Sequence, residues 1–377
     1  MVSFIQITLA KLAIAIQNLA WGIGQPLFAA MAEKVGERKA LFLGAVTYAV
    51  GLLLSSYAVT PIEHQFYEIL VGFGIAGTGF GVILALVGRA ASDKNRSLTL
   101  GIATAAGSAG QIIGPPAANY LLQSMNWSSV FVLFAVTIIV VMVALPFIKT
   151  NTPAAAPNMI EESMSAVLRK AFFDPNYIMI FLGFFSCGFQ LGFVTAHFPA
   201  FIAEACAAIP TSSILQSMGV STTTALGALA IALIGVTNIV GSIASGALGA
   251  KYSKKYILSL IYVGRTIACV LFITFPMTPT TVILFSLVMG ALWLATVPPT
   301  SGLVAQIYGL KYMGTLYGIV FFSHQLGSFL GVWLGGTLYD QFGTYDLVWW
   351  VGIGFGVFSA IIHLPVNERP YASRLAT

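Results

Sequence analysis

The side chains that could do chemistry in this chain are few, and the most informative is an arginine within a long apolar run. Arg265 lies about nine residues into the run 256–276, roughly 14 Å deep at 1.5 Å per residue. A guanidinium offers a planar fork of donors that matches a carboxylate, and a charge at such depth usually faces a cavity or a partner. We interpret Arg265 as an anion-binding group. The alternative is a structural pair with a carbonyl or a polar side chain.

A second pair of charges lies nearer the outer ends of two apolar runs. Glu68 is the one acid clearly inside a run, and Lys11 lies at a similar depth in another. We expect the two to pair, as a gate or a proton-linked switch. A structural contact between helices is the alternative, as is a Lys11 side chain that reaches outward to the interface.

Two histidines are candidates for proton chemistry or for helix contacts. His324, followed by Gln325, lies near the middle of the run 313–339. A histidine exchanges a proton near neutral pH, but a histidine in a membrane also joins helices by hydrogen bonds, and both interpretations stay open. His197 lies near the outer end of its run, so a capping or gate-loop role is as reasonable as contact with a solute.

Several uncharged polar side chains also lie in the middle of apolar runs. A single amide there often serves only to join helices, but several together indicate a polar pathway. Trp293 is a candidate wall of that pathway, because a lipid-facing tryptophan usually lies at a membrane interface. The pair Pro298-Pro299 predicts a kink just beyond it. The amides are Gln17, Asn18, Gln111, Gln190 and Asn238.

The elements that must position these residues are membrane helices. The 377 residues are 58% hydrophobic and only 8% charged, whereas a soluble protein has about 25% charged residues. The sequence therefore predicts an all-α polytopic membrane protein, because an apolar span must satisfy its backbone internally. Eleven runs are long enough to span a membrane: 4–31, 39–59, 64–89, 97–122, 127–148, 176–203, 220–249, 256–276, 279–306, 313–339 and 345–365.

The basic residues predict the orientation. All Lys and Arg except Lys11 and Arg265 lie in alternate loops and in the C-terminal tail. The positive-inside rule places those loops and the C-terminus in the cytoplasm, as in a multi-pass protein of the plasma (inner) membrane. Because the charge is scattered, a nucleic-acid partner is not expected. The expected partners are the lipid bilayer and a small-molecule solute, and we expect a monomer.

An internal repeat at an offset of 217 residues divides the chain into two halves. Gly110 and Gly114 match Gly327 and Gly331, and Leu12–Ala15 matches Leu229–Ala232. The offset predicts halves at 1–149 and 176–377 in the same orientation, joined by a linker at 150–175 that ends in a short amphipathic helix. The run 176–203 has no counterpart in the first half. We therefore expect that the first half lacks its opening helix, through a misplaced start or, as a less favoured alternative, a truncation.

Two charged turns, Ala29–Lys39 and Gly246–Lys255, occupy corresponding places in the halves. We expect them to act as conformational latches that close the inner side by ion pairs and helix-end contacts. The residues assigned to this role are Glu33, Lys34, Arg38, Lys251 and Lys255.

The first turn resembles the signature of the major facilitator superfamily between its second and third helices, G-x-x-x-D-R-x-G-R-K, with Glu33 at the acidic position. Gly110–Pro115 is similar to the family pattern G-x-x-x-G-P. Within the superfamily the chain looks most like bacterial relatives of the monocarboxylate transporters, on the stretches 103–110, 196–200, 237–242 and 323–328. The better-studied members pair an Asp and an Arg on the eighth helix, where this chain has neither. The resemblance implies the major facilitator fold, with two parallel pseudo-symmetric helical bundles.

Together these features predict a secondary active transporter of a small organic solute, an organic anion such as a monocarboxylate, by alternating access. Proton coupling is left open. A non-transporting sensor or receptor and an inactive truncated carrier are the alternatives. No enzyme is expected, because the sequence contains no clustered acid–base motif, no metal-ligand cluster and no phosphate-binding loop. No cofactor is expected, and the separated Cys187, Cys206 and Cys269 predict no disulfide.

Overall fold

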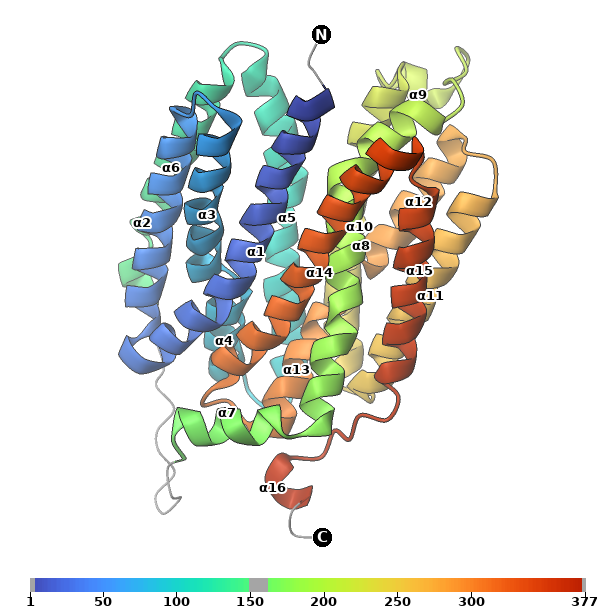
Figure 1. The fold of residues 1–377 in the computed structure, drawn as a ribbon. Coiled ribbons are helices and arrows are strands. Elements are labelled where there is room, and N and C mark those ends of the chain that lie inside the picture. The colour runs from blue at the N-terminus through green and yellow to red at the C-terminus, as the bar shows by residue number, and fades with distance from the viewer. Residues whose placement is uncertain (1–3, 149–161, 375–377) are drawn as a thin grey trace.

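The computed structural model describes residues 4–148 and 162–374, without the side chains of 4–11, 115, 116 and 119. All regular structure in the described ranges is helical, and the long helices stand side by side in two bundles (Figure 1). The first bundle contains α1 (Phe4–Val35), α2 (Glu37–Ser56), α3 (Pro61–Thr78), α4 (Phe80–Ala90), α5 (Arg96–Leu122) and α6 (Trp127–Met142). The second contains α8 (Pro175–Ala205), α10 (Thr223–Gly249), α11 (Lys254–Thr274), α12 (Pro279–Leu292), α13 (Val297–Tyr308), α14 (Met313–Phe342) and α15 (Asp346–Ile362).

The predicted apolar runs all fall on helices. Eight helices of the described chain are long and apolar enough to cross a membrane, when α3–α4 and α12–α13 are each taken as one span. The runs 4–31, 97–122 and 345–365 fall on α1, α5 and α15. The all-α membrane architecture is thus confirmed, and the count of eleven spans stays a prediction.

Short helices lie at both ends of the bundle. The helix predicted at the end of the linker is α7 (Met164–Phe172), which begins at Ser163, whose hydroxyl accepts a hydrogen bond from the Ala166 N–H. It lies across the end of the bundle that carries α16 (Tyr371–Arg374), which we call the inner end; α9 (Ile214–Ser217) lies at the other, outer end (Figure 1). The rest of the predicted linker lies outside the described residues. A 3-10 turn, η1 (Leu145–Phe147), follows α6.

One helix of each half is broken. The break between α3 and α4 lies at Gly79, and the break between α12 and α13 spans 293–296. Pro298 lies in the first turn of α13, where a proline is tolerated because the first N–H groups need no helical partner. The kink predicted from Pro298-Pro299 is confirmed, and it places Trp293 at the break.

Glycines bring α8 and α14 into close contact in the second half. A β-carbon placed on Gly188 would lie 1.6 Å from the His324 carbonyl oxygen, and one on Gly327 would lie 2.2 Å from that of Phe185. No side chain larger than hydrogen fits at either point without moving a backbone. The glycines of α14 therefore form a helix-packing surface, and this surface fixes the position of His324.

The two halves meet along two helix pairs. At the contact of α5 with α10, a β-carbon on Gly101 would lie 2.6 Å from the Ser242 carbonyl oxygen. At the contact of α1 with α14, a β-carbon on Gly318 would lie 2.9 Å from the Pro26 Cα. The close approaches lie toward the inner ends of these helices, so the structure holds the inner ends of the two halves together.

The C-terminal segment fastens the inner ends of α8 and α13. Arg374 of α16 donates to both carboxylate oxygens of Asp174, and the Tyr308 hydroxyl donates to the same carboxylate at 2.6 Å. Asn176 also donates to it, from its backbone at 3.0 Å and from its amide at 2.8 Å. Burial raises the pKa of Asp174, but these hydrogen bonds outweigh burial and lower the pKa to about 2.

We expect Asp174→Asn to lower the stability of the protein at neutral pH by about 2 kcal/mol, because hydrogen bonds to a charged acceptor are lost. A lowered folded-state pKa gives stability that is present above the ordinary value near 4 and is lost as the pH falls toward 2. The difference in Tm between wild type and variant should therefore shrink as the pH is lowered from 5 to 3. Asp93→Asn is the control, because Asp93 makes only an exposed pair with Arg96; an equal loss in both variants would contradict the expectation.

Candidate functional site

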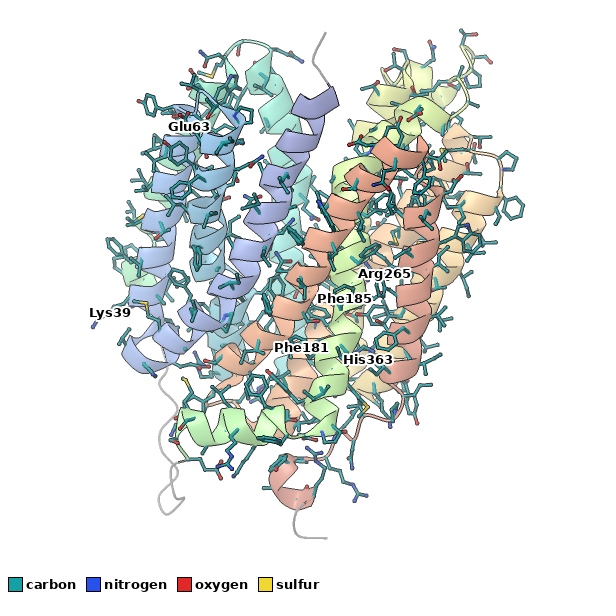
Figure 2. All side chains as sticks on the ribbon, in the orientation of Figure 1. Lys39, Glu63, Phe181, Phe185, Arg265 and His363 are labelled. Atoms are coloured by element: carbon teal, nitrogen blue, oxygen red, sulfur yellow. The ribbon has the colours of Figure 1, made fainter. Side chains whose placement is uncertain are left out.

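Arg265 lies on the buried stripe of α11. The buried residues of that helix recur at three and four positions, through Leu258, Tyr262, Arg265, Cys269 and Phe272. This spacing directs one face of the helix into the second half and leaves the opposite face to the lipid. Figure 2 shows Arg265 at mid-height in this half, whereas Lys39 points away from the bundle.

The Arg265 guanidinium is fully buried, and none of its three nitrogen atoms has a hydrogen-bond partner in the described structure. The ring of Tyr262 lies beside the guanidinium, with its centroid 6.0 Å from Arg265 Cζ. Cys187 and Cys269 lie within electrostatic range. An unpaired buried charge costs several kcal/mol, so this arrangement needs an anion.

Other polar groups around the guanidinium also lack partners. The hydroxyls of Tyr262 and Tyr317 and the Trp293 indole N–H are buried without hydrogen bonds among the described atoms, and the His324 side chain interacts with the Cys187 thiol. Cys187 lies within electrostatic range of Arg265, His324, Tyr262 and Tyr317, which places these groups around one point. Buried polar groups in native proteins are normally paired, so the cluster is suited to hold a polar ligand. We call Arg265, Tyr262, Cys187, His324 and Tyr317 the Arg265 cluster.

The break between α12 and α13 borders this cluster. The Cys187 Sγ lies 3.2 Å from Thr296 Oγ1 and 3.9 Å from the Trp293 carbonyl oxygen. The broken helix therefore reaches the same point as the guanidinium. Trp293 is 2% exposed, in agreement with a wall of the site.

A chain of hydrogen bonds leads from the Arg265 cluster to the other half. Gln325 Nε2 donates to the Asn18 oxygens at 3.3 and 3.4 Å, so Gln325 Oε1 is left to accept from His324 Nδ1 at 2.8 Å. A neutral His324 with this proton on Nδ1 presents the lone pair of Nε2 to the cluster. The structure thus brings together Asn18, Gln325 and His324 from the predicted set.

Asn238 is used elsewhere. Its Oδ1 accepts from the Leu294 N–H at 2.9 Å and from Ser242 at 3.2 Å, and its Nδ2 donates to Ser108 of the other half at 2.8 Å. Both the oxygen and the nitrogen of the Asn238 amide are thus hydrogen-bonded to protein atoms. In this structure Asn238 satisfies the helix break and joins α10 to α5, and its role as a solute ligand stays a prediction.

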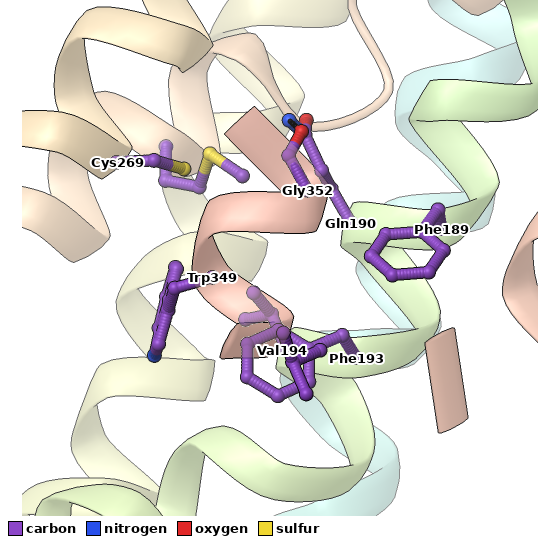
Figure 3. Close-up of a pocket in the computed structure, with 9 residues that line it drawn as sticks. Phe189, Gln190, Phe193, Val194, Cys269, Trp349 and Gly352 are labelled. Carbon is purple, nitrogen blue, oxygen red and sulfur yellow. Dashed lines mark hydrogen bonds between the residues drawn. The ribbon is translucent and has the colours of Figure 1, made fainter. Parts of the chain in front are cut away.

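Gln190 makes its contacts within the second half. Its Nε2 donates to the Gly352 carbonyl at 2.9 Å, and it lines a small space inside the second half with Trp349, Phe193 and Cys269 (Figure 3). The space measures about 10 Å³, enough for about one water molecule. A contact of Gln190 with a solute stays a prediction. Gln111 lies instead at the contact of α5 with α10, where its Cβ is 3.6 Å from a β-carbon placed on Gly235.

The outer candidates have local partners. His197 Nε2 pairs with the Val332 carbonyl of α14 at 2.9 Å, and its ring stacks on Phe193. His197 therefore joins two helices of one half, and its gating role stays a prediction. Glu68 accepts from Ser55 at 3.3 Å, with His64 Nε2 at 3.7 Å. The Lys11 side chain lies outside the described part of the chain, so its pair with Glu68 stays a prediction.

The first charged turn contains a contact between the halves. Glu33 Oε1 accepts from the N–H groups of Gly314 and Thr315, at 2.7 and 3.2 Å, and Glu33 Oε2 accepts from the Thr315 hydroxyl. Arg89 lies 4.0 Å from Glu33 and pairs with Glu37. Glu33 thus caps the start of α14 from the opposite half, and its role as a latch stays a prediction.

The remaining latch residues are placed differently. Arg38 donates to the Ile148 carbonyl at 2.6 and 2.8 Å within its own half, and Lys34 and Lys251 are exposed. In the second turn the Lys255 backbone N–H donates to Glu368 at 2.7 Å, and its ammonium lies 5.1 Å from the Tyr256 ring. The contacts of Arg38 and Lys255 lie within single halves, and their role as latches stays a prediction.

Sequence reasoning missed Tyr262, Tyr317, Cys187 and Arg89. The spacing of Tyr262 and Arg265, three residues apart on one helix, is a signal that could have found the first. The other three come from distant helices, so no local spacing reveals them. The three cysteines are free, and no group of three or more His, Cys, Asp or Glu in the described chain could hold a metal ion.

The fold and the site define a class: a polytopic membrane protein with two helical halves and an unpaired cation buried at mid-height. The profile of the Major Facilitator Superfamily matches residues 3–205 and 193–376. The chain therefore belongs to the Major Facilitator Superfamily, and it is a membrane transporter rather than an enzyme.

Relatives and solved structures agree with this assignment. The chain is similar to the Uncharacterized MFS-type transporter YcxA of Bacillus subtilis, at 25% identity over 95% of this chain and 85% of that protein. It is similar to Monocarboxylate transporter 12-B of Danio rerio, at 25% identity over 90% and 74%. Its fold matches the proton:xylose symporter XylE, with a TM-score of 0.73 at 15% identity over 98% and 89% of the two chains.

Proposed function

We propose that this protein is a secondary transporter of a small organic anion such as a monocarboxylate, and that Arg265 binds the anionic group. The observation that carries the proposal is the fully buried guanidinium without a hydrogen-bond partner. A carboxylate would accept two parallel hydrogen bonds from it. The surrounding Tyr262, Tyr317 and Trp293 provide further donors and an aromatic wall.

The similarity to proteins named monocarboxylate transporters supports this substrate class. Transport would proceed by rocking of the two halves around the site, as in other carriers built from parallel repeats. The Glu33 contact at the inner end supports the idea of a closing and opening inner gate. We place the protein in the plasma (inner) membrane as a monomer, with the C-terminus in the cytoplasm.

The test is a matched-pair screen on the purified protein in liposomes. Small carboxylates such as acetate, pyruvate and benzoate are compared with their neutral amides, by uptake and by ligand-induced change in Tm. We expect at least one carboxylate to be taken up and to raise the Tm, and its amide to do neither. Equal responses to a carboxylate and its amide would remove the anion assignment.

We also propose that a proton accompanies the anion and that His324 carries it. The His324 side chain interacts with the Cys187 thiol of the Arg265 cluster, and its ring lies between Phe184 and Phe321, with ring centroids 4.9 and 5.1 Å away. A histidine that gains a proton as a carboxylate enters would keep the local charge constant. The neighbouring symporter structures are consistent with such coupling.

For His324→Gln we expect uptake that no longer responds to an imposed pH gradient, because the amide keeps a polar group but cannot take up a proton. Counterflow of labelled anion, which needs no net proton movement, should persist. The measurement is uptake into liposomes with and without an inward proton gradient. Gln325→Ala, which alters the neighbouring hydrogen bond but retains the imidazole, is the control; a gradient response that survives in His324→Gln would exclude His324 as the carrier.

A further inference from the structure

The helix breaks of the two halves occupy the same place in the internal repeat. At the offset of 217 residues, Gly79 between α3 and α4 corresponds to Thr296 at the end of the break between α12 and α13. The Thr296 hydroxyl lies 3.2 Å from the Cys187 thiol of the Arg265 cluster. The break in the second half therefore borders the proposed anion site, and the break at Gly79 is its counterpart in the first half.

The break in the second half is satisfied by two side chains of α10. Ser242 donates to Asn238 Oδ1 at 3.2 Å, and the same oxygen accepts from the Leu294 N–H of the break at 2.9 Å. Asn238 Nδ2 donates to the Ser108 hydroxyl at 2.8 Å. Both polar atoms of the Asn238 amide are therefore engaged.

The corresponding residues of the first half, Trp21 and Gln25 of α1, leave a donor unused. The Trp21 indole N–H donates to Gln25 Oε1 at 2.7 Å. Because an indole nitrogen is only a donor, this bond also fixes which end of the amide carries the oxygen. Gln25 is fully buried, and its Nε2 has no hydrogen-bond partner among the described residues. Buried donors in native proteins are normally paired, so this amide is suited to hold a ligand.

The Gln25 amide nitrogen lies on the first turn of α4, a helix that contacts both α1 and α14 (Figure 1). A β-carbon placed on Gly81 would lie 2.5 Å from Gln25 Nε2. Gly79 at the start of α4 makes no capping hydrogen bond from a side chain, and the first N–H groups of a helix have no helical partner. The break thus directs donors from a side chain and from a helix N-terminus to one place, so a ligand there must offer an acceptor.

The charges near this place favour a neutral acceptor. A β-carbon placed on Gly314 would lie 2.9 Å from Glu33 Oε1 and 3.0 Å from the Gly81 carbonyl oxygen, so the Glu33 carboxylate is close to the first turn of α4. Arg89 is shared between Glu33 and Glu37. Two carboxylates and one guanidinium leave a net negative charge, which repels a second anionic group. A carbonyl oxygen fits better.

One aromatic ring packs against both the break at Gly79 and the Arg265 cluster. The rings of Trp21 and Phe80 lie 5.1 and 5.7 Å from the ring of Phe321. Phe321 also stacks on His324 of the cluster, with ring centroids 5.1 Å apart. A flat ring of a ligand would pack along Phe321 and join a carboxylate at Arg265 to an oxygen at α4.

We propose that Gln25 and the first turn of α4, which we call the Gln25 subsite, bind a neutral carbonyl oxygen of the transported carboxylate. The proposal rests on the proposed function, which supplies the binding site of the carboxylate at Arg265. It narrows the solute to aromatic carboxylates with a carbonyl oxygen on the opposite side of the ring. Such a solute would contact one broken helix in each half, and rocking of the halves would move its two ends apart.

The test compares 4-acetylbenzoate with 4-isopropenylbenzoate, in which a CH₂ group replaces the ketone oxygen. Binding of each compound to the purified protein is measured by equilibrium dialysis. We expect wild type to bind the ketone about 10-fold more tightly, the effect of one hydrogen bond. Gln25→Leu should bind both compounds equally, because it has no N–H donor. Gln123→Leu, at an exposed glutamine that ends α5, is the control and should keep the preference.

A second measurement on the full-length protein does not depend on the folding of Gln25→Leu. In protein labelled with 5-fluorotryptophan, the fluorine signal of Trp21 is identified by its loss in Trp21→Phe. This signal should shift with the ketone and not with the alkene, because Trp21 donates to the Gln25 amide. A signal that responds equally to both compounds would contradict the subsite.

Three binding results would also overturn the Gln25 subsite: no preference in wild type, a preference that survives in Gln25→Leu, and no binding of either compound. Arg265→Ala separates this proposal from the proposed function. It should weaken the binding of both compounds alike and keep their ratio. A ratio that depends on Gln25, with affinities that do not depend on Arg265, would support the subsite and overturn the anion assignment.

Discussion

Arg265→Ala is expected to lower uptake of the carboxylate at least about 100-fold and yet leave the protein without ligand as stable as wild type, or more stable. The loss of uptake follows from the loss of the charged fork that binds the anion, since 100-fold corresponds to about 2.7 kcal/mol. The unchanged stability follows from the lack of a hydrogen-bond partner for the guanidinium. Removal of an unpaired buried charge relieves a cost rather than breaking a contact.

The structural and the ligand-binding interpretations of Arg265 therefore predict different effects of Arg265→Ala on the stability of the protein without ligand. A structural arginine, paired with a carbonyl or a neighbouring side chain, would destabilise the protein by about 3–5 kcal/mol when truncated. A ligand-binding arginine would not. Thermal unfolding with and without the carboxylate separates them: saturating ligand at 100 times Kd stabilises wild type by about 2.7 kcal/mol, and Arg265→Ala should show no such shift.

Two further variants serve as comparisons for Arg265→Ala. Arg265→Lys keeps the charge but loses the fork, so it should retain part of the binding. Arg369→Ala removes an arginine from the exposed C-terminal segment and should leave uptake unchanged. Normal uptake by Arg265→Ala, or a large loss of stability without ligand, would show that the anion binds elsewhere.

Much of the fold could be predicted because the local sequence determines where membrane helices form. Low charge and long apolar runs identify the helices, and the offset of 217 relates Gly110 to Gly327 without any structure. The depth of Arg265 followed from its place in the run. Its burial on the inward stripe of α11 agrees with that reading.

The composition of the site could not be predicted in the same way. A mid-membrane amide looks identical in sequence whether it binds a solute, as proposed near Asn18, or satisfies a helix break, as Asn238 does for the Leu294 N–H. Gln190 turns into its own half because Gly352 of α15 offers a carbonyl there. The partner of each amide depends on how helices far apart in the sequence pack together, and the local spacing of residues does not reveal that packing.

Glu33→Gln is expected to shift the balance between the closed and open inner gate by about 30-fold toward the open state. Glu33 Oε1 accepts from two N–H groups at the first turn of α14, and Oε2 accepts from the Thr315 hydroxyl. Burial raises the pKa of Glu33, but the helix dipole and the charged hydrogen bonds favour its carboxylate form, together by about 2 kcal/mol, which is roughly 30-fold. A neutral amide accepts fewer of these bonds and brings donors of its own.

The contact crosses between the halves, so its loss should change their separation rather than the fold of either one. Spin labels at the exposed positions 34 and 311, one in each half at the inner end, would report this as a growing population of longer distances. Glu63→Gln is the matched control. Glu63 also accepts from N–H groups at a helix start, those of Val59 and Thr60, but within its own half. If Glu33→Gln leaves the distance distribution as in wild type, or if Glu63→Gln shifts it equally, Glu33 only caps a helix and does not control the gate.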